Sequence, residues 1–525
     1  MPTRRRILQA SVALALPSIA RGEDLQVLKV VPQADLASLD PVWTTSYQTR
    51  DHGFLVFDTL FGVDSRFQAS PQMAEGAVSE ADGRLWRITL RDGLRFHDGS
   101  KVLARDAAAS VRRWGARDGF GQALLAACDE VAAADDRTLV FRLKRPFSLL
   151  PDALGKASPS LCPIMPERLA ATDPFTQVTE MVGSGPYRYK PDERVAGSLV
   201  VYERNTDYIP RSGGTADGTA GPKVAHFDRV EWHIIPDPQT VAAAIQQGEV
   251  DWWLSPDADL LPVLRRQPDV TVETVWPTGF VATMRFNQLH PPFDNPAIRR
   301  AIIGAVSQAD YMIGMVGTDP SLWRDRVGYF CPGTPMASTA GMAALTGPRD
   351  LGAVRAELAK AGYAGETVVI LTPTDIASAR ALADITADML RQIGMNVGAP
   401  AMDWATLVQR RVKTEPVGQG GWSLFHTSWS GLDMVNPAGH VFLRGNGRKA
   451  APGWPDSPRI EALRDDWFAA PTPEAQQMIA RQLQLQAFID VPYIPLGQYF
   501  APSAYRANLT GVLKGNPVFW NLRRT

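Results

Sequence analysis

The sequence predicts an exported α/β protein with two or three domains, and three observations support this prediction. The chain has 525 residues, well beyond the size at which one hydrophobic core usually stops growing. Segments with the alternating pattern of strands are repeatedly followed by segments with helical spacing of apolar residues. The first residues also carry the pattern of an export signal. With 45% hydrophobic and 21% charged residues, the composition is that of an ordinary globular protein.

Residues 1–22 are predicted to be a cleaved twin-arginine signal peptide. Residues 3–9 are similar to the twin-arginine motif, residues 10–16 are mainly apolar, and residues 18–20 follow the small-any-small cleavage pattern. The alternatives are an ordinary Sec signal or an N-terminal anchor, although a spanning helix needs roughly 20 apolar residues. Because the first cysteine is Cys128, we expect a free periplasmic protein and not a lipoprotein.

The first clear structural unit begins at residue 85. Residues 85–91 alternate between apolar and polar side chains, which predicts a half-buried strand, and Asp92-Gly93 predicts a turn. The alternation resumes over residues 94–96, and apolar residues then recur at helical spacing over residues 106–114. The segment is therefore predicted to be strand, turn, strand and helix.

A second unit links two predicted strands through a helix. Residues 230–234 alternate as in a strand, and Asp237-Pro238 has the chemistry of a helix start. Gly248 is expected to end this helix, and residues 250–254 form the next predicted strand. Residues 211–221 are rich in Gly, Thr and Ala, which predicts a surface loop.

Further along the chain the same alternation continues. Asn295 and Asp350 are predicted to cap two helices, the second of which ends before Gly362. Residues 368–371 predict a strand, and the apolar spacing over residues 382–393 predicts another helix.

Charge and cysteine content exclude several classes of function. The formal net charge is -1 and no long run of one sign occurs, so a nucleic-acid partner is not expected. The sequence contains neither a clustered histidine pattern nor a CxxC unit, so it does not indicate a metal site. The three cysteines, Cys128, Cys162 and Cys331, allow at most one disulfide, and we expect buried free thiols.

Residues 85–114, LWRITLRDGLRFHDGSKVLARDAAASVRRW, resemble the signature of extracellular solute-binding protein family 5. Further landmarks of that family follow in order along most of the chain: Leu39-Asp40-Pro41, Asp58-Thr59-Leu60-Phe61, residues 182–187, residues 204–208, residues 247–251, and Phe286-Asn287 with residues 291–293 and 299–301. Each landmark taken alone has an explanation as a turn or a helix cap.

The resemblance implies an α/β, two-lobed, periplasmic-binding-protein-like fold (type II, cluster C) with an extra subdomain in the first lobe. The expected division is residues 23–60, 183–285 and 500–525 for subdomain Ia, 61–182 for subdomain Ib, and 286–499 for the second lobe. The chain is expected to cross between the lobes near Phe286 and again near Tyr499.

The function implied by this resemblance is the periplasmic substrate-binding component of a bacterial ABC importer. Such a protein captures a small solute, here expected to be a di- or oligopeptide, by lobe closure and delivers it to inner-membrane permease and ATPase subunits. It is expected to be a monomer without cofactor or enzymatic activity. A nickel-chelate or haem binder that uses His426 and His440 is one alternative. An exported hydrolase is another, although Ser184 in Gly-Ser-Gly lacks the GxSxG context.

The expected ligand-binding residues come from both halves of the chain. In related peptide-binding proteins an acid of the second lobe receives the ligand's amino terminus, and the resemblance assigns that role to Asp433. Asn436 stands where a second acid is usual, and Asp433 has a turn cap as its alternative role. The other expected contacts are Trp429 and Trp422 from the second lobe and Trp43, Thr44, Thr45 and Ser46 from the first. For these aromatic residues the alternative is core packing.

Overall fold

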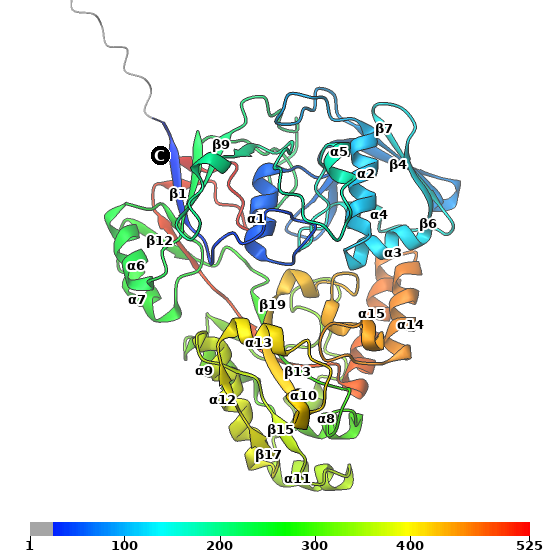
Figure 1. Ribbon diagram of the computed structural model, residues 1–525, viewed down its shortest axis with the longest axis vertical. Coiled ribbons are helices and arrows are strands. Elements are labelled where there is room, and N and C mark those ends of the chain that lie inside the picture. Colours follow the sequence, from blue (N-terminus) through cyan, green and yellow to red (C-terminus); the bar gives the residue numbers. More distant parts are fainter. Residues whose placement is uncertain (1–24) are drawn as a thin grey trace, which may run out of the picture.

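The computed structural model describes residues 25–525, which form two lobes joined by two connections (Figure 1). The predicted signal peptide of residues 1–22, with its twin-arginine motif and cleavage site, lies outside the described residues. Within residues 25–525, no helix has both the length and the apolar character needed to cross a membrane.

The first lobe is built on a seven-stranded sheet. Its strands, in spatial order, are β12 (Val270–Glu273), β21 (Ser503–Arg506), β11 (Trp252–Trp253), β1 (Val27–Val31), β10 (Arg229–His233), β9 (Leu199–Arg204) and β8 (Tyr187–Tyr189). The predicted strand–helix–strand unit is confirmed, because α6 (Pro238–Gln247) connects β10 to β11. Asp237 caps α6 by accepting a hydrogen bond from the Thr240 N–H, and Gly248 ends it with a φ of 76°.

An inserted unit with its own sheet completes the first lobe. It contains β4 (Ala74–Glu80), β5 (Leu85–Leu90), β7 (Thr138–Leu143) and β6 (Cys128–Ala133) in that order, with α2 (Ala104–Gly115), α3 (Gly119–Ala127), α4 (Leu150–Leu154) and α5 (Glu167–Ala170). The strand and helix predicted over residues 85–114 are confirmed. The strand predicted at residues 94–96 is wrong, because Phe96 and Ser100 close a tight turn around Asp98. Only an isolated bridge between Arg95 and Lys101 remains.

The second lobe has a four-stranded sheet at its centre, covered by helices. The strand order is β14 (Trp323–Arg324), β20 (Ile494–Tyr499), β13 (Phe280–Phe286) and β19 (Leu424–Ser430). The helices are α8 (Pro296–Ile303), α9 (Gln308–Val316), α10 (Ala343–Thr346), α11 (Leu351–Lys360), α12 (Ala377–Gln392), α13 (Trp404–Arg410), α14 (Pro458–Ala469) and α15 (Pro473–Asp490). The predicted caps Asn295 and Asp350 are confirmed, since both side chains accept hydrogen bonds from the first turn of their helices.

Ten further α-helices and β-strands are found in the described residues, besides short 3-10 helices. They are α1 (Tyr47–Val56), α7 (Leu261–Leu264), β2 (Phe61–Val63), β3 (Ala69–Pro71), β15 (Thr367–Val369), β16 (Thr372–Pro373), β17 (Asn396–Gly398), β18 (Ala401–Met402), β22 (Leu509–Thr510) and β23 (Arg523–Arg524). The predicted loop at residues 211–221 is irregular, as expected.

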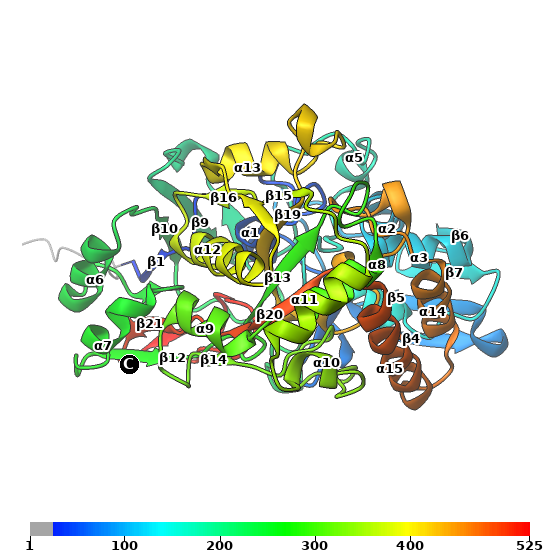
Figure 2. The ribbon, with the colours of Figure 1, turned by 90° about the horizontal axis from the view of Figure 1, so that it is seen from below.

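Two connections join the lobes, one between β12 and β13 and one between β20 and β21. Figure 2 shows β13 and β20 side by side, with the chain running on from β20 toward β21. The first connection occupies residues 274–279, earlier than the crossing expected near Phe286, because residues 280–286 already pair within the second sheet. Gly279 in this connection has a φ of 50°, and a Cβ there would lie 2.4 Å from the Tyr499 carbonyl oxygen. The second connection occupies residues 500–502, directly after Tyr499.

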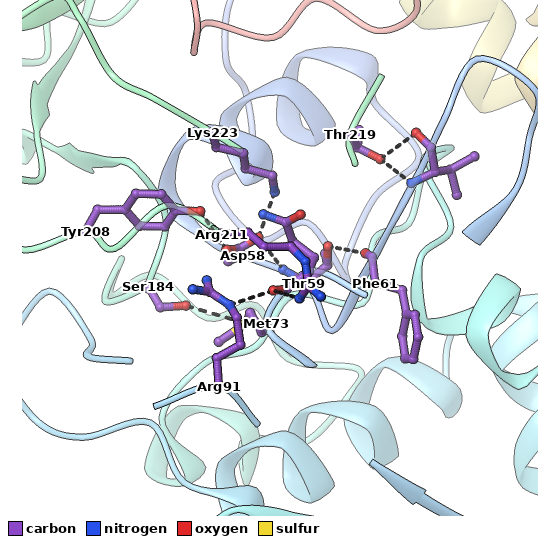
Figure 3. Close-up of polar contacts among 12 residues, drawn as sticks. Asp58, Thr59, Phe61, Met73, Arg91, Ser184, Tyr208, Arg211, Thr219 and Lys223 are labelled. Atoms are coloured by element: carbon purple, nitrogen blue, oxygen red, sulfur yellow. Dashed lines mark hydrogen bonds and ion pairs between the residues drawn. The ribbon is translucent and has the colours of Figure 1, made fainter. Parts of the chain in front are cut away.

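A buried polar cluster ties residues 58–63 to residues 208–223 (Figure 3). The Asp58 carboxylate accepts hydrogen bonds from the Lys223 ammonium at 2.7 Å and from the Tyr208 hydroxyl at 2.9 Å. The side chains of Asp58 and Lys223 are at most 1% exposed. Thr219 accepts a hydrogen bond from the Val63 N–H at 2.8 Å. The cluster therefore anchors the β2–β3 hairpin, which lines the cleft described below.

The three cysteines are free and buried, as expected from the sequence. Burial raises the pKa of the Cys128 thiol to about 12 and has the same effect on Cys331. These thiols are therefore protonated and unreactive at neutral pH.

Candidate functional site

A cavity of about 530 Å³ lies between the inserted unit and the second lobe. Its wall on the first lobe consists of residues from the β2–β3 hairpin, Phe120 and the segment 149–158. Its wall on the second lobe consists of residues from the segments 335–336, 432–439 and 467–477. This volume falls within the roughly 300–1,000 Å³ typical of sites for small ligands.

The two lobes are in contact beside this cavity. Phe468 of α14 lies with its ring 5.9 Å from that of Phe120 and 6.1 Å from that of Phe147 in the inserted unit. Buried apolar residues of the inserted unit and the second lobe also form one continuous cluster. A ligand in the cavity would therefore contact both lobes.

Asp433 lies at the junction between the lobes, in a short turn after β19. Its carboxylate is buried, and Oδ2 accepts a hydrogen bond of 2.8 Å from the hydroxyl of Tyr47 in the first lobe. The same hydroxyl accepts a hydrogen bond of 2.8 Å from the Ser430 N–H. Within residues 25–525, no hydrogen bond reaches the other carboxylate oxygen, Oδ1. One oxygen of Asp433 is thus free to accept a ligand donor.

Burial raises the pKa of Asp433 to about 6, and the hydrogen bond from Tyr47 together with the charges of Lys156 and Arg50 limits the rise. Lys156 lines the large cavity, but its ammonium is already bound to the Asp118 carboxylate and the Pro159 carbonyl oxygen. Asp433 therefore carries a negative charge at neutral pH, and no cationic side chain of residues 25–525 is bonded directly to it.

The alternative role of Asp433 as a turn cap does not match the hydrogen bonds around it. Ser430 caps this turn by accepting from the Leu432 N–H. Asn436, which stands where a second acid was expected, accepts from the backbone N–H groups of Ala438 and Gly439. The carboxylate of Asp433 is directed instead at the first lobe.

The four contacts expected from the first lobe do not line this cavity. Trp43 is half-buried with the Arg117 guanidinium over its ring, 4.9 Å from the ring centroid. Thr44 and Ser46 are bonded locally, since Thr44 accepts from the Ser46 N–H and Ser46 donates to Gln48. Thr45 is exposed. In the next turn of chain, Tyr47 donates a hydrogen bond to Asp433 of the second lobe.

The two tryptophans expected from the second lobe do not line the cavity. Trp422 is a core residue, 1% exposed, packed against Phe425 and Trp454, and its indole N–H donates to the Lys413 carbonyl oxygen. Trp429 on β19 packs edge-on against Phe442, with 5.1 Å between the two ring centroids. Trp422 is therefore a core residue, which was the alternative role considered for it.

The histidines considered for a nickel-chelate or haem site have structural roles in the core of the second lobe. His426 and His440 are buried in the second lobe, hydrogen-bonded to Thr386 and to Tyr329 and Tyr493 respectively, and burial lowers both pKa values to about 3.

Ser184 lies on a bend that packs closely against α1. A Cβ on its neighbour Gly183 would lie 2.0 Å from the Val56 carbonyl oxygen. The glycines beside Ser184 are thus required by the close approach of two backbones, and among the described residues the Ser184 hydroxyl hydrogen-bonds only to the Met73 sulfur.

Comparison with known proteins agrees with this architecture. The family model of the bacterial extracellular solute-binding proteins, family 5 Middle, matches residues 68–449. A relative from Sinorhizobium fredii, described as a probable peptide ABC transporter periplasmic-binding protein, is 37% identical over 98% of both chains.

Two solved structures share the fold. The periplasmic binding protein AgaA of A. tumefaciens, in complex with agropinic acid, has a TM-score of 0.78 at 20% identity over 95% of this chain and 99% of that one. A dipeptide-binding protein of Pseudoalteromonas, in complex with Met-Leu, has a TM-score of 0.76 at 19% identity over 95% and 100%.

The two lobes and the cavity between them define a two-lobed fold of the periplasmic-binding-protein type, which confirms the predicted fold class. The chain belongs to family 5 of the bacterial extracellular solute-binding proteins. This family and these relatives consist of solute-binding proteins of transport systems and not of enzymes.

Proposed function

We propose that this chain is the periplasmic binding component of an ABC importer and that it captures a short peptide by its amino terminus. In this proposal the protein acts as a monomer without catalysis or cofactor, and its closed form is recognised by the membrane permease. Export through a cleaved twin-arginine or Sec signal would deliver it to the periplasm. The name of the Sinorhizobium relative and the dipeptide bound by the Pseudoalteromonas protein both support a peptide ligand.

The observation that carries the proposal is the environment of Asp433. A buried carboxylate is unfavourable unless it is paired, and this one has one oxygen bonded to Tyr47 while the other accepts no hydrogen bond within residues 25–525. A ligand ammonium would supply a charge-assisted partner for it. The cavity of about 530 Å³, which is lined by Leu432 and not by Asp433 itself, would accommodate the rest of a small ligand.

Closure would follow from differential binding. Tyr47 and Asp433 belong to different lobes, so a ligand that contacts both favours the closed form over the open one. The two connections, at residues 274–279 and 500–502, are the segments where the backbone would change direction.

The test is the affinity of the Asp433→Asn variant for a dipeptide such as Ala-Ala, measured by isothermal titration calorimetry. Asparagine keeps the size and the acceptor oxygen but removes the charge, so we expect the affinity to fall at least about tenfold. Asp466→Asn, an exposed acid on α14, is the matched control and should bind like the natural protein. Equal affinity in all three proteins would refute the role of Asp433.

A further inference from the structure

The charged side chains around the cavity of about 530 Å³ all come from one lobe. Arg66, Asp152 and Lys156 of the inserted unit line it, whereas every lining residue that the second lobe contributes from the described part of the chain is apolar or neutral. The charge that a ligand meets in this cavity therefore depends on these three residues and on what already neutralises them.

The two cationic residues of this lining are already paired with acids. Arg66 donates hydrogen bonds of 3.3 and 3.2 Å to the Asp64 carboxylate, and its side chain is 77% exposed. The Lys156 ammonium is bonded to the Asp118 carboxylate and donates to the Pro159 carbonyl oxygen at 2.7 Å. An anionic group of a ligand would have to compete with these carboxylates, so neither cation is open to it.

Asp152, the one acid in this lining, has no such partner. It lies in the first turn of α4, next to Pro151, which also lines the cavity. Within residues 25–525, its carboxylate forms no ion pair and accepts no hydrogen bond from another side chain. Burial raises the pKa of Asp152 to about 6, and a hydrogen bond from its own backbone N–H limits the rise. At neutral pH the cavity thus contains an ionised acid without a cation.

The position of Asp152 in a helix does not account for this burial. An acid in the first turn of a helix is favoured by about 0.3–1 kcal/mol when it is exposed to solvent. Asp152 gains this benefit only from the five residues of α4, and the direction of its pKa shift means that burial outweighs it. A partly buried carboxylate that faces a cavity without a partner is typical of a site that a ligand cation completes.

The rest of the lining suits the aliphatic part of a basic side chain. Phe120 and Leu149 of the first lobe and Val435 and Trp467 of the second line the same cavity as Asp152. Lysine and arginine side chains pack their methylene groups against apolar surfaces while the charged end reaches a polar partner. The cavity therefore offers such a side chain both an apolar wall and an acid.

We propose that Asp152 receives a cationic group of the ligand inside this cavity, so that the protein favours peptides with a basic side chain. This inference rests on the proposed function, in which Asp433 receives the peptide's amino terminus, and it adds a second acid for a second positive charge. The two acids act at different places, because Asp152 lines the cavity and Asp433 does not. Ammonium and guanidinium groups would both serve, since each donates charge-assisted hydrogen bonds.

The test compares lysine peptides with norleucine peptides, because norleucine keeps the carbon chain of lysine and lacks its ammonium. Ala-Lys is paired with Ala-norleucine, and Lys-Ala with norleucine-Ala, so that the basic side chain is tried at both positions. We expect the lysine peptide of at least one pair to bind about tenfold or more tightly than its norleucine counterpart. Calorimetry at pH 7 measures all four affinities.

Variants assign the preference to Asp152. Asp152→Asn keeps the size of the side chain and removes its charge, so the ratio of lysine to norleucine affinity should approach one. Asp152→Glu keeps the charge and should retain a ratio above one. Asp192→Asn, at an exposed acid of the first lobe outside the cavity lining, is the matched control and should keep the natural ratio. A merely structural defect would weaken both members of a pair equally and would leave the ratio unchanged.

The outcomes separate this inference from the proposed function. Equal affinity within both pairs in the natural protein, including no measurable affinity for any of the four peptides, would overturn the preference for a basic side chain. A ratio that survives Asp152→Asn, or that is lost in Asp433→Asn instead, would overturn the assignment to Asp152. Ala-Ala, bound in an Asp433-dependent manner in the same experiments, would show that the proposed function stands even when this inference fails.

Discussion

The protonation of Asp433 provides a quantitative prediction for ligand binding. Burial raises the pKa of this carboxyl to about 6, so a proton and a ligand ammonium compete for it in the range between pH 5 and 7. Between these limits a peptide amino group, with a pKa of roughly 7.7–8.0, stays mostly protonated. Lowering the pH therefore changes Asp433 and not the charge of the ligand.

The size of the effect follows from the pKa. With a value of about 6, the ionised fraction of Asp433 falls from about nine-tenths at pH 7 to about one-tenth at pH 5. The affinity for a dipeptide should therefore be about tenfold weaker at pH 5 than at pH 7. At pH 6, ligand binding should release about half a proton per molecule.

The stability of the free protein should respond to this group in the opposite direction. The folded-state pKa of Asp433 lies above its ordinary value of 3.8, so between about pH 4 and 6 the folded state binds more protons here than the unfolded state. The contribution of Asp433 to stability is therefore lost as the pH rises through this range. Weaker binding at pH 5 is thus not explained by unfolding driven by this carboxyl.

Calorimetry in two buffers with different ionisation enthalpies measures both the affinity and the released protons. Asp433→Asn is the necessary control, because burial also raises the pKa of Asp51 and of Asp152 to about 6. In this variant the dependence on pH between 5 and 7 should largely disappear. An affinity that is unchanged between pH 5 and 7, or that falls equally in the variant, would refute the assignment of the titrating group.

Three further predictions concern stability and closure. Gly279→Ala would place a Cβ 2.4 Å from a carbonyl oxygen at a φ of 50° and should destabilise the protein by at least about 1–2 kcal/mol in urea unfolding. Gly418→Ala, where the added Cβ meets nothing within 4 Å, should be nearly neutral, and equal losses of stability in the two variants would contradict the steric argument. Lys223→Met should lower the free energy of unfolding by about 3–5 kcal/mol, because it leaves the buried Asp58 carboxylate without its cation. Adding Asp58→Asn should recover much of that loss, and additive losses in the double variant would contradict a stabilising Asp58–Lys223 ion pair. Trp422→Ala should cost about 3–5 kcal/mol while the folded fraction keeps its affinity for Ala-Ala, and selective loss of affinity would return Trp422 to the binding site.

Local sequence patterns determined the elements whose ends depend on nearby residues. The helix after Asp237, the caps Asn295 and Asp350, and the strand beginning at Leu85 all lie where periodicity and capping chemistry indicated. The family and its two-lobed fold followed from motifs that are turns and caps. The strand expected at residues 94–96 does not form, because backbone groups that would pair with a neighbouring strand make hydrogen bonds within the turn around Asp98 instead.

The site itself depends on contacts between residues far apart in the chain, and only the tertiary structure decided these. Tyr47 and Asp433 are separated by 386 positions, so no local pattern could pair them. Trp422 and Trp429 have the same residue type and lie on the same segment, yet the first is core and the second half-buried, because the depth of a side chain is set by what packs against it from other elements. The sequence alone thus predicted the class of protein and proposed one acid for the site, whereas the contact of that acid with Tyr47 exists only because folding brings the two lobes together.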